Sequence, residues 1–323
     1  MSAVNAKDVL CSAAGRWQRI DPLLPGPRPS ADPGCGAELT VPAASGRAAA
    51  IGWCRHRQIK PGAAELAWGA AGQFWLTAIV AGDPAEPGLG AALDELLVRW
   101  RAHLAAEPAT AGHDTQAAVR WPSRDIAGTC ALLRHGLQPL TVIAARPAGR
   151  AMPDAARWPS GLRIRPAGPA DAAAVAALTM EVIHFDQHLG SVLLRPQAEQ
   201  VQRQAAEQTL AQPEPWTWLA ERDGHAVGLL GAEPPERAGW IAAATGQAPV
   251  AYLGTLSVLP GQRGAGVGTA LVAGLHRELD AAGVAVTLLH HGQLNPLSAP
   301  FWNRVGYRPL WTNWEIRPAR ALQ

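Results

Sequence analysis

Apolar residues in the last quarter of the chain recur with the period of a helix. They are spaced every four positions and so share one helical face: Val267, Leu271, Leu275 and Leu279. The segment 259–268, LPGQRGAGVG, overlaps the start of this face and holds four glycines, which are typical of a loop. The pattern therefore predicts a helix that begins at a glycine-rich loop.

The rest of the second half alternates between strand-like and helical patterns. Apolar runs predict strands at residues 162–165, 216–220, 226–232, 250–259, 284–289 and 311–316. Asp171 and Pro196 mark the starts of two helices, because Asp is a favoured N-cap and Pro suits a first helical turn. A short helix is expected at 297–304, and Gly283 is expected to end the glycine-loop helix. Helices and strands interleave around one sheet, so the predicted fold class is α/β (α+β).

The first half repeats parts of the second half in the same order. GLGAAL at 88–93 corresponds to GVGTAL at 266–271, and HGLQPL at 135–140 corresponds to VGYRPL at 305–310. Between the copies lies a Pro-, Gly- and Ala-rich stretch without helical period. We therefore expect two related domains, residues 1–155 and 156–323. The first domain has no clear counterpart of the two helices that follow Asp171 and Pro196.

Composition and charge narrow the class of protein. Hydrophobic residues make up 48% of the chain and charged residues 17%, and the formal net charge of +2 comes without a run of Lys or Arg. We expect neither a nucleic-acid nor a membrane partner. The absence of a signal-peptide core and of a membrane-spanning apolar stretch predicts a cytoplasmic protein. No CxxC pair occurs, so free thiols are expected at Cys11, Cys35, Cys54 and Cys130.

The glycine-rich loop has the chemistry of an anion site. Glycine lets a ligand approach the backbone, and a helix N-terminus presents unpaired N–H groups with a partial positive charge. A phosphate or pyrophosphate is the expected ligand group. A P-loop would need a lysine after Gly268, and a dinucleotide fingerprint would need a glycine at position 269 or 271, so neither motif is present. A loop that only packs against its neighbours remains an alternative.

The pattern that fits is Arg263-Gly-Ala-Gly-Val-Gly268. With Leu256-Ser-Val258 before it, and Asn295 and FWNRVGY at 301–307 after it, the second half resembles the GNAT superfamily of acyl-CoA-dependent N-acyltransferases. The resemblance implies two tandem GNAT-like domains, each a mixed, mostly antiparallel twisted sheet flanked by helices. The first of them is degenerate, and the second is the N-acetyltransferase domain.

The resemblance also implies a binding mode for acetyl-CoA, the expected cosubstrate, without a metal. Loop amides hold the pyrophosphate, the backbone of the preceding strand pairs with the pantetheine arm, and side chains further along the chain contact that arm. The residues implied are Leu256, Ser257, Val258, Arg263, Gly264, Ala265, Gly266, Val267, Gly268, Thr269, Asn295, Ser298 and Trp302.

Proton transfer has several candidates. The acid of the family is commonly a tyrosine four residues before the glycine of VGY, where this chain has Trp302, which does not titrate; Ser298 or a water beside Asn295 could replace it. The strand before the loop carries no carboxylate, and Tyr252, with an ordinary pKa near 10, is a poor base. Glu233 is a further candidate for the base. So are four polar residues of EVIHFDQH: Glu181, His184, Asp186 and His188. The alternative for this segment is a solvated helix end without a role in the site.

Three other residues near these motifs have expected places. Tyr307 is predicted to lie in the core. His290 and His291 could line the site, but neighbours on a strand point to opposite faces and so would not share a metal.

The first copy departs further from the family pattern. Its loop retains Gly88 and Gly90 but has Ala85 at the arginine position, and Asp125 and Leu132 stand where the second copy has Asn295 and Trp302. We expect this domain to be structural and to complete the substrate cleft. A second CoA site is the alternative.

The sequence thus predicts an N-acyltransferase that moves an acetyl group from acetyl-CoA to an amine by direct attack. The expected partner is a small-molecule or peptide amine acceptor, and the expected assembly is a monomer or homodimer. A non-catalytic acyl-CoA-binding or regulatory protein is the alternative.

Overall fold

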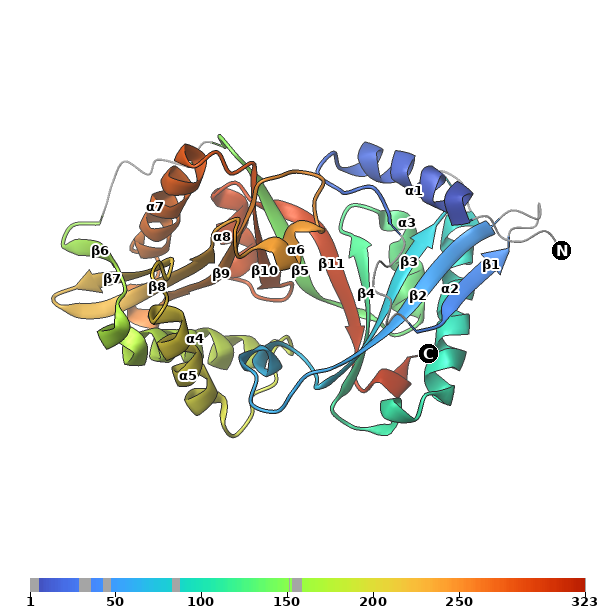
Figure 1. Ribbon diagram of the computed structural model, residues 1–323, viewed down its shortest axis with the longest axis horizontal. Helices are drawn as coiled ribbons and strands as arrows, with labels where there is room; N and C mark the ends of the chain where they lie inside the picture. The colour runs from blue at the N-terminus through green and yellow to red at the C-terminus, as the bar shows by residue number, and fades with distance from the viewer. Residues whose placement is uncertain are drawn as a thin grey trace.

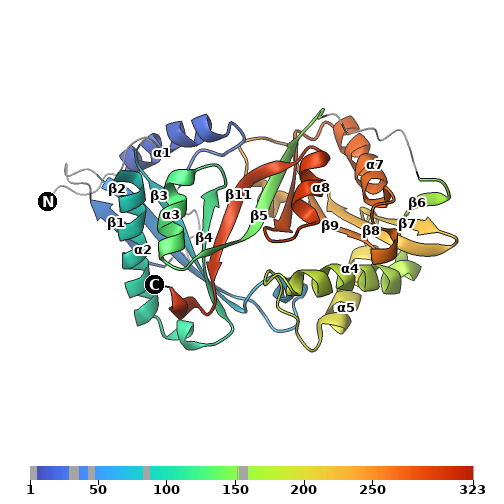
Figure 2. The ribbon, with the colours of Figure 1, turned by 180° about the vertical axis from the view of Figure 1, so that it is seen from behind.

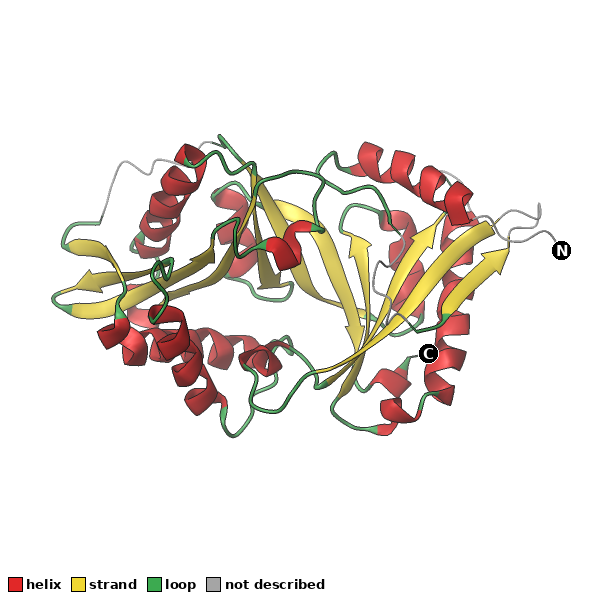
Figure 3. Ribbon diagram, in the orientation of Figure 1, coloured by secondary structure: helices red, strands yellow, loops and turns green. Residues whose placement is uncertain are grey.

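The strands of the protein form one continuous sheet, which Figure 3 shows running through the molecule with helices on both sides. The computed structural model describes residues 6–28, 36–42, 48–82, 88–150, 152 and 159–322 (Figure 1). The sheet has 11 strands in the order β1-β2-β3-β4-β11-β5-β10-β9-β8-β7-β6. Its pairings are antiparallel except for β3 with β4 and β9 with β10, so the predicted mixed, mostly antiparallel sheet is confirmed.

The described residues of the first half form three α-helices and five strands. In chain order they are α1 (Ala6–Ile20), β1 (Glu38–Pro42), β2 (Ala48–Gln58), β3 (Gly72–Val80), α2 (Gly88–Ala106), β4 (Thr115–Pro122), α3 (Ile126–Arg134) and β5 (Gln138–Pro147). A short 3₁₀ helix, η1 (Ala64–Trp68), connects β2 to β3.

The second half follows the predicted order of elements. It comprises β6 (Leu162–Pro166), α4 (Ala172–Gln187), α5 (Ala198–Leu210), β7 (Thr217–Arg222), β8 (His225–Glu233), α6 (Gly239–Ala242), β9 (Val250–Val258), α7 (Val267–Ala281), β10 (Val286–Gly292), α8 (Ser298–Arg304) and β11 (Arg308–Ile316). Every predicted strand and helix is present, and the short α6 is an addition. Asp171 is the N-cap of α4, but its carboxylate binds Arg165 and the Gly168 N–H rather than the helix amides.

The two halves exchange their last strands. β5 of the first half lies between β11 and β10, and β11 of the second half lies between β4 and β5. Figure 2 shows β11, in red, between the two green strands β4 and β5. The proposed domain boundary near residue 155 falls outside the described residues and stays a prediction, but the sheet itself crosses from one half to the other.

An apolar cluster on one face of the sheet also joins the halves. Val9 and Trp17 of α1 pack with Leu310 and Trp311 at the start of β11. The rings of Trp17 and Trp311 meet edge to face with centroids 5.2 Å apart, and the Trp311 indole N–H donates to the carbonyl of Ala244. Because burial of a large apolar side chain contributes about 1.5–3 kcal/mol, this cluster adds substantially to the stability of the joint.

Two further expectations concern the helices and the thiols. Of the helices that the structure describes, none combines the length and the apolar character needed to cross a bilayer. Cys11, Cys54 and Cys130 are free thiols as predicted, and Cys35 lies outside the described residues.

Because of the strand exchange, the halves are expected to stay together after the chain is cut between them. A site-specific protease sequence inserted between residues 152 and 159 tests this expectation. After cleavage, the two fragments should elute as one species from a sizing column and unfold in one calorimetric transition, since separation exposes the edges of β4, β5, β10 and β11. Elution of two separate folded fragments without denaturant would contradict the expectation.

Candidate functional site

A cleft opens where the parallel strands β9 and β10 separate. They pair only over residues 250–253 and 286–289; beyond Leu253, β9 pairs with β8 alone, and beyond Leu289, β10 pairs with β5 alone. A register shift against β8 makes Gly254 an extra residue in β9 at this point. One backbone edge of residues 254–258 therefore has no strand partner and faces the cleft.

A cavity of about 720 Å³ lies along this cleft, and residues of the first half also line it. Its volume is in the range of small-molecule sites. Of the thirteen residues predicted to contact acetyl-CoA, the exposed Ala265 does not line this cavity. The twelve that do are Leu256, Ser257, Val258, Arg263, Gly264, Gly266, Val267, Gly268, Thr269, Asn295, Ser298 and Trp302.

The N-terminus of α7 opens onto the cavity without a side-chain cap. Gly264 and Gly266 have φ values of +77° and +82°, a backbone conformation that favours glycine, and Gly266 is the N-cap residue. Arg263 lies beside the loop, where its Nε donates to the Val258 carbonyl at 3.0 Å. The first-turn amides of α7 thus remain available to an anionic ligand.

Asp186 and Asn295 form a buried pair on the cavity wall. Asn295 Nδ2 donates to Asp186 Oδ1 at 2.7 Å, while Asn295 Oδ1 accepts from the amides of Leu297 and Ser298 at the start of α8. Burial raises the pKa of Asp186, and the hydrogen bond from Asn295 opposes this in part. The amide predicted to contact the CoA arm is therefore also a link between α4 and α8.

Tyr252, His290 and Trp240 cluster at the point where β9 and β10 part. Tyr252 Oη lies 3.0 Å from His290 Nδ1, and the Trp240 ring is nearly parallel to the imidazole, at 8°. Burial lowers the pKa of His290 to about 3, and burial together with the charge of Glu233 raises the pKa of Tyr252. Both groups are neutral at pH 7, so they are suited to hydrogen bonding and unsuited to act as bases.

The remaining base candidates lie outside the cavity wall. His184 and His188 are exposed at the end of α4, and neither they nor Glu181 line the cavity. Glu233 also stays outside the wall, although it accepts from the Trp240 indole at 2.7 Å.

Tyr307, His290 and His291 lie where the sequence analysis placed them. Tyr307 is buried in the core, as predicted, with its hydroxyl 3.0 Å from His276 Nε2. Both His290 and His291 line the cavity. Within the described ranges, no three His, Cys, Asp or Glu side chains gather in a way that would hold a metal ion.

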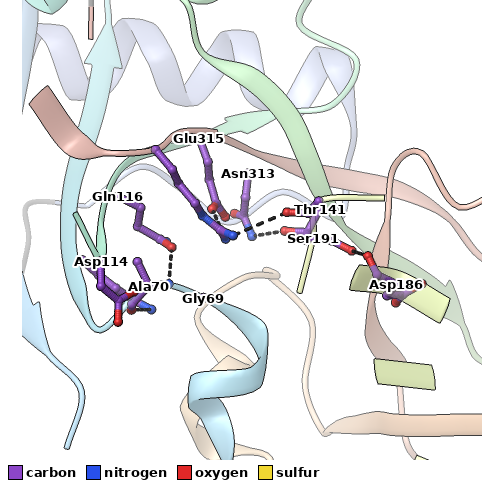
Figure 4. Close-up of polar contacts among 12 residues, drawn as sticks. Gly69, Ala70, Asp114, Gln116, Thr141, Asp186, Ser191, Asn313 and Glu315 are labelled. Atoms are coloured by element: carbon purple, nitrogen blue, oxygen red, sulfur yellow. Dashed lines mark hydrogen bonds and ion pairs between the residues drawn. The ribbon is translucent and has the colours of Figure 1, made fainter. Parts of the chain in front are cut away.

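The floor of the cavity contains residues that the sequence analysis missed. Gln116 and Arg120 of β4 and Thr141 of β5 come from the first half, and Asn313 and Glu315 come from β11. Figure 4 shows Asn313 donating to Thr141, with Ser191 and Asp186 beyond them. The repeats in the sequence indicate which strands correspond, but they do not indicate that β11 and β5 change places. This exchange brings the five residues to the cavity.

In the first half, a buried arginine lies near the point where β3 and β4 separate. Arg16 of α1 is fully buried; its Nη1 donates to the carbonyl of Val80, the last residue of β3, and its Nε lies 3.2 Å from Asp125 Oδ2. Asp125 is the residue that aligns with Asn295. Ala85, at the arginine position of this copy, lies outside the described residues.

Comparisons with known proteins agree with this geometry. The sequence model of the acetyltransferase (GNAT) family matches residues 184–307. A solved GCN5-related N-acetyltransferase from Sphaerobacter thermophilus is 20% identical over 97% of this chain and 92% of that chain, with a TM-score of 0.54. No curated protein matches the chain.

Two further solved structures are similar at lower scores. A GCN5-related N-acetyltransferase from Kribbella flavida is 14% identical, with a TM-score of 0.45, over 97% of this chain and 95% of that chain. A tandem GNAT protein from the clavulanic acid biosynthesis pathway is 16% identical, with a TM-score of 0.45, over 99% of this chain and 97% of that chain.

The lowered pKa of His290 predicts a pH-dependent stability. Below about pH 6.5 the unfolded chain takes up a proton on this imidazole, while the folded protein does so only near pH 3, so this part of the stability is lost as the pH falls. Urea unfolding at pH 7 and pH 5 should show a decrease that is about 1–2 kcal/mol smaller in His290→Gln than in the parent. His225→Gln, at an exposed histidine of the β7–β8 hairpin, should behave like the parent. An equal decrease in His290→Gln would show that His290 is charged in the folded state.

Proposed function

We propose that this protein, whose residues 184–307 match the sequence model of the acetyltransferase (GNAT) family, transfers an acetyl group from acetyl-CoA to the amine of a small-molecule or peptide acceptor. The observation that carries the proposal is the cleft between β9 and β10, which leads to the uncapped N-terminus of α7. A pyrophosphate satisfies the free amides of a helix N-terminus, and an extended amide-bearing arm satisfies an unpaired strand edge.

The residues around the cleft fit acyl-CoA in this orientation. The amides of residues 264–269 and the guanidinium of Arg263 hold the pyrophosphate, and the free edge of residues 256–258 pairs with the pantetheine arm. When bound, acyl-CoA supplies an activated thioester carbon.

Asp186 is our candidate for the group that accepts the proton of the acceptor amine. It is buried and lines the cavity, and its raised pKa makes it a stronger base than an ordinary aspartate. Asn295 fixes its orientation through one carboxylate oxygen. This assignment supplies a carboxylate to a site whose central strand has none.

Ser298 and the Tyr252–His290 pair complete the proposed machinery. Ser298 lies on the cavity wall one turn before Trp302 and is our candidate to protonate the departing thiolate. Tyr252 and His290, both neutral, offer hydrogen bonds at the point where the strands part. Such donors stabilise negative charge that develops on a carbonyl oxygen.

Gly266→Glu is expected to abolish the binding of acetyl-CoA, because it places a carboxylate where the pyrophosphate binds. Acetyl-CoA at one hundred times its dissociation constant should stabilise the parent by about 2.7 kcal/mol, a thermal shift of a few degrees, and this shift should vanish in the variant. Gly266→Ala carries the same backbone strain without the charge and should retain much of the shift. Gly88→Glu, at the matching loop of the first half, should retain all of it. A full shift in Gly266→Glu would contradict the site.

Asp186→Asn is expected to lower kcat by about 10²–10⁴-fold while the thermal shift with acetyl-CoA persists. Asparagine keeps the size of the side chain and an oxygen that accepts from Asn295. In the parent, kcat/KM should rise with pH as Asp186 loses its proton, above the ordinary range of an aspartate, and this rise should be missing from the residual activity of the variant. Glu199→Gln, an exposed change on α5, is the control. CoA release at the parental rate from Asp186→Asn would exclude the proposed role, and acetyl-CoA binding without CoA release from any amine would favour a non-catalytic binding protein.

A further inference from the structure

Arg120 presents a cation to the cavity without an acidic partner. It lies on β4 of the first half, and its polar contact is Nε to the neutral Asn313 Oδ1 at 3.0 Å. Its guanidinium carbon lies 5.9 Å from the centre of the Trp75 ring. No carboxylate in the described part of the chain pairs with it. Burial lowers its pKa to about 10, with no charge that offsets the effect.

Two carboxylates of the cavity wall are already paired with other arginines. Arg57 binds both carboxylate oxygens of Glu65 at 2.7 Å, and Glu315 accepts from Arg317 at 3.0 Å. These pairs leave neither Glu65 nor Glu315 to neutralise Arg120. A partly buried guanidinium that remains unpaired is costly, and a carboxylate that binds in its plane satisfies two of its N–H groups at once.

Strand register places Arg120 on the same row as the mouth of the cleft. Arg120, Asn313, Thr141 and Gly292 lie opposite one another on β4, β11, β5 and β10. Three strand spacings separate the first from the last, about 14 Å between backbones. A molecule that binds Arg120 through its carboxylate and enters the cleft with its amine therefore carries the two groups at separate ends.

We propose that the acceptor is an amine that carries a carboxylate at its far end, and that Arg120 binds this carboxylate while the amine enters the cleft between β9 and β10. This inference rests on the proposed function. The neutral amine nitrogen bonds to the acyl carbon and the C–S bond of the thioester breaks. Asp186 takes a proton from the nitrogen, and the departing thiolate takes up a proton through Ser298, so that the proton lost by the nitrogen balances the one gained by the sulfur. The first half thereby selects the acceptor, and the second half binds the donor.

Trp68, Trp75 and Trp240 suit the part of the acceptor between its two ends. All three line the cavity, and Trp68 and Trp240 are 43% and 58% exposed, unusual for a side chain of this size. Apolar ring faces there accommodate a chain of methylene or peptide groups without adding charge. The amine and the carboxylate are then the groups that fix the orientation of the acceptor.

The test compares acceptors that differ only in charge at the far end. The pairs are 5-aminopentanoate with 5-aminopentanamide, and triglycine with triglycinamide, so that free small molecules and peptide carboxylates are distinguished. With acetyl-CoA as donor, kcat/KM is measured for each. A carboxylate should be preferred over its amide by roughly ten- to a hundredfold in at least one pair.

The variants assign this preference to Arg120. Arg120→Gln should bring the ratio close to one, mainly through the KM of the carboxylate, without a lower melting temperature, because it removes an unpaired cation. Arg120→Lys should restore part of the preference, and Arg134→Gln, which removes an exposed arginine of α3, should leave the ratio unchanged.

Three results would overturn the inference. They are an equal use of carboxylate and amide by the parent, a preference that survives in Arg120→Gln, or a lack of turnover of every carboxylate-bearing amine by a protein that binds acetyl-CoA. A parent that shows no thermal shift with acetyl-CoA would instead point to failure of the proposed function itself.

Discussion

The exchange of β5 and β11 is the constraint on which the rest of the structure depends. In each half the sheet is completed by the last strand of the other half, so β10 pairs with β5 and β4 pairs with β11. A strand buried between two others satisfies its backbone groups on both edges, and either half alone would lose such a strand. The position of β10, and with it one wall of the cleft, is therefore set by the first half. This dependence gives a physical reason for the two halves to stay together in one chain.

The two clefts show how similar backbones acquire different roles. In both, parallel strands pair for a few residues and then separate, next to a helix that begins with glycines. In the first half, Arg16 of α1 occupies the gap and pairs with Asp125, whereas in the second half the aligned Asn295 turns to Asp186 and the gap stays open. The first half thus contributes residues to the wall of the open cleft.

Local patterns predicted the helices and strands well, because the spacing of apolar residues and the positions of turn-forming residues can be read from neighbouring positions in the sequence. The spacing of apolar residues from Val267 to Leu279 predicted α7. The loop before it has a positive φ at position 266, which favours the glycine found there. The same reasoning failed where partners are distant in sequence. Nothing near Asn295 indicates that it binds a residue 109 positions away, and nothing near Arg120 indicates that it lies under a cleft formed by the other half. The candidates in EVIHFDQH could not be separated by spacing alone, because only tertiary packing turns Asp186 inward and leaves His184 in solvent.

The distribution of charge around the cavity also bears on how an acceptor would enter it. At the point where the strands part, Tyr252 and His290 are neutral, and the charges that act on them include those of Glu233 and Arg120. Asp186 lies toward α4 and α8, and Arg120 lies on β4, on the opposite side of the exchanged strands. An acceptor that arrives as an ammonium at one end and a carboxylate at the other is oriented by this pair of charges before any contact is complete, since opposite charges attract over several ångströms in a site of low dielectric. The ammonium must then lose a proton to become a nucleophile. Asp186, the carboxylate that attracts the ammonium, has a raised pKa and is therefore suited to take this proton. Orientation and activation of the amine would thus depend on one side chain, Asp186, with Arg120 holding the other end of the molecule.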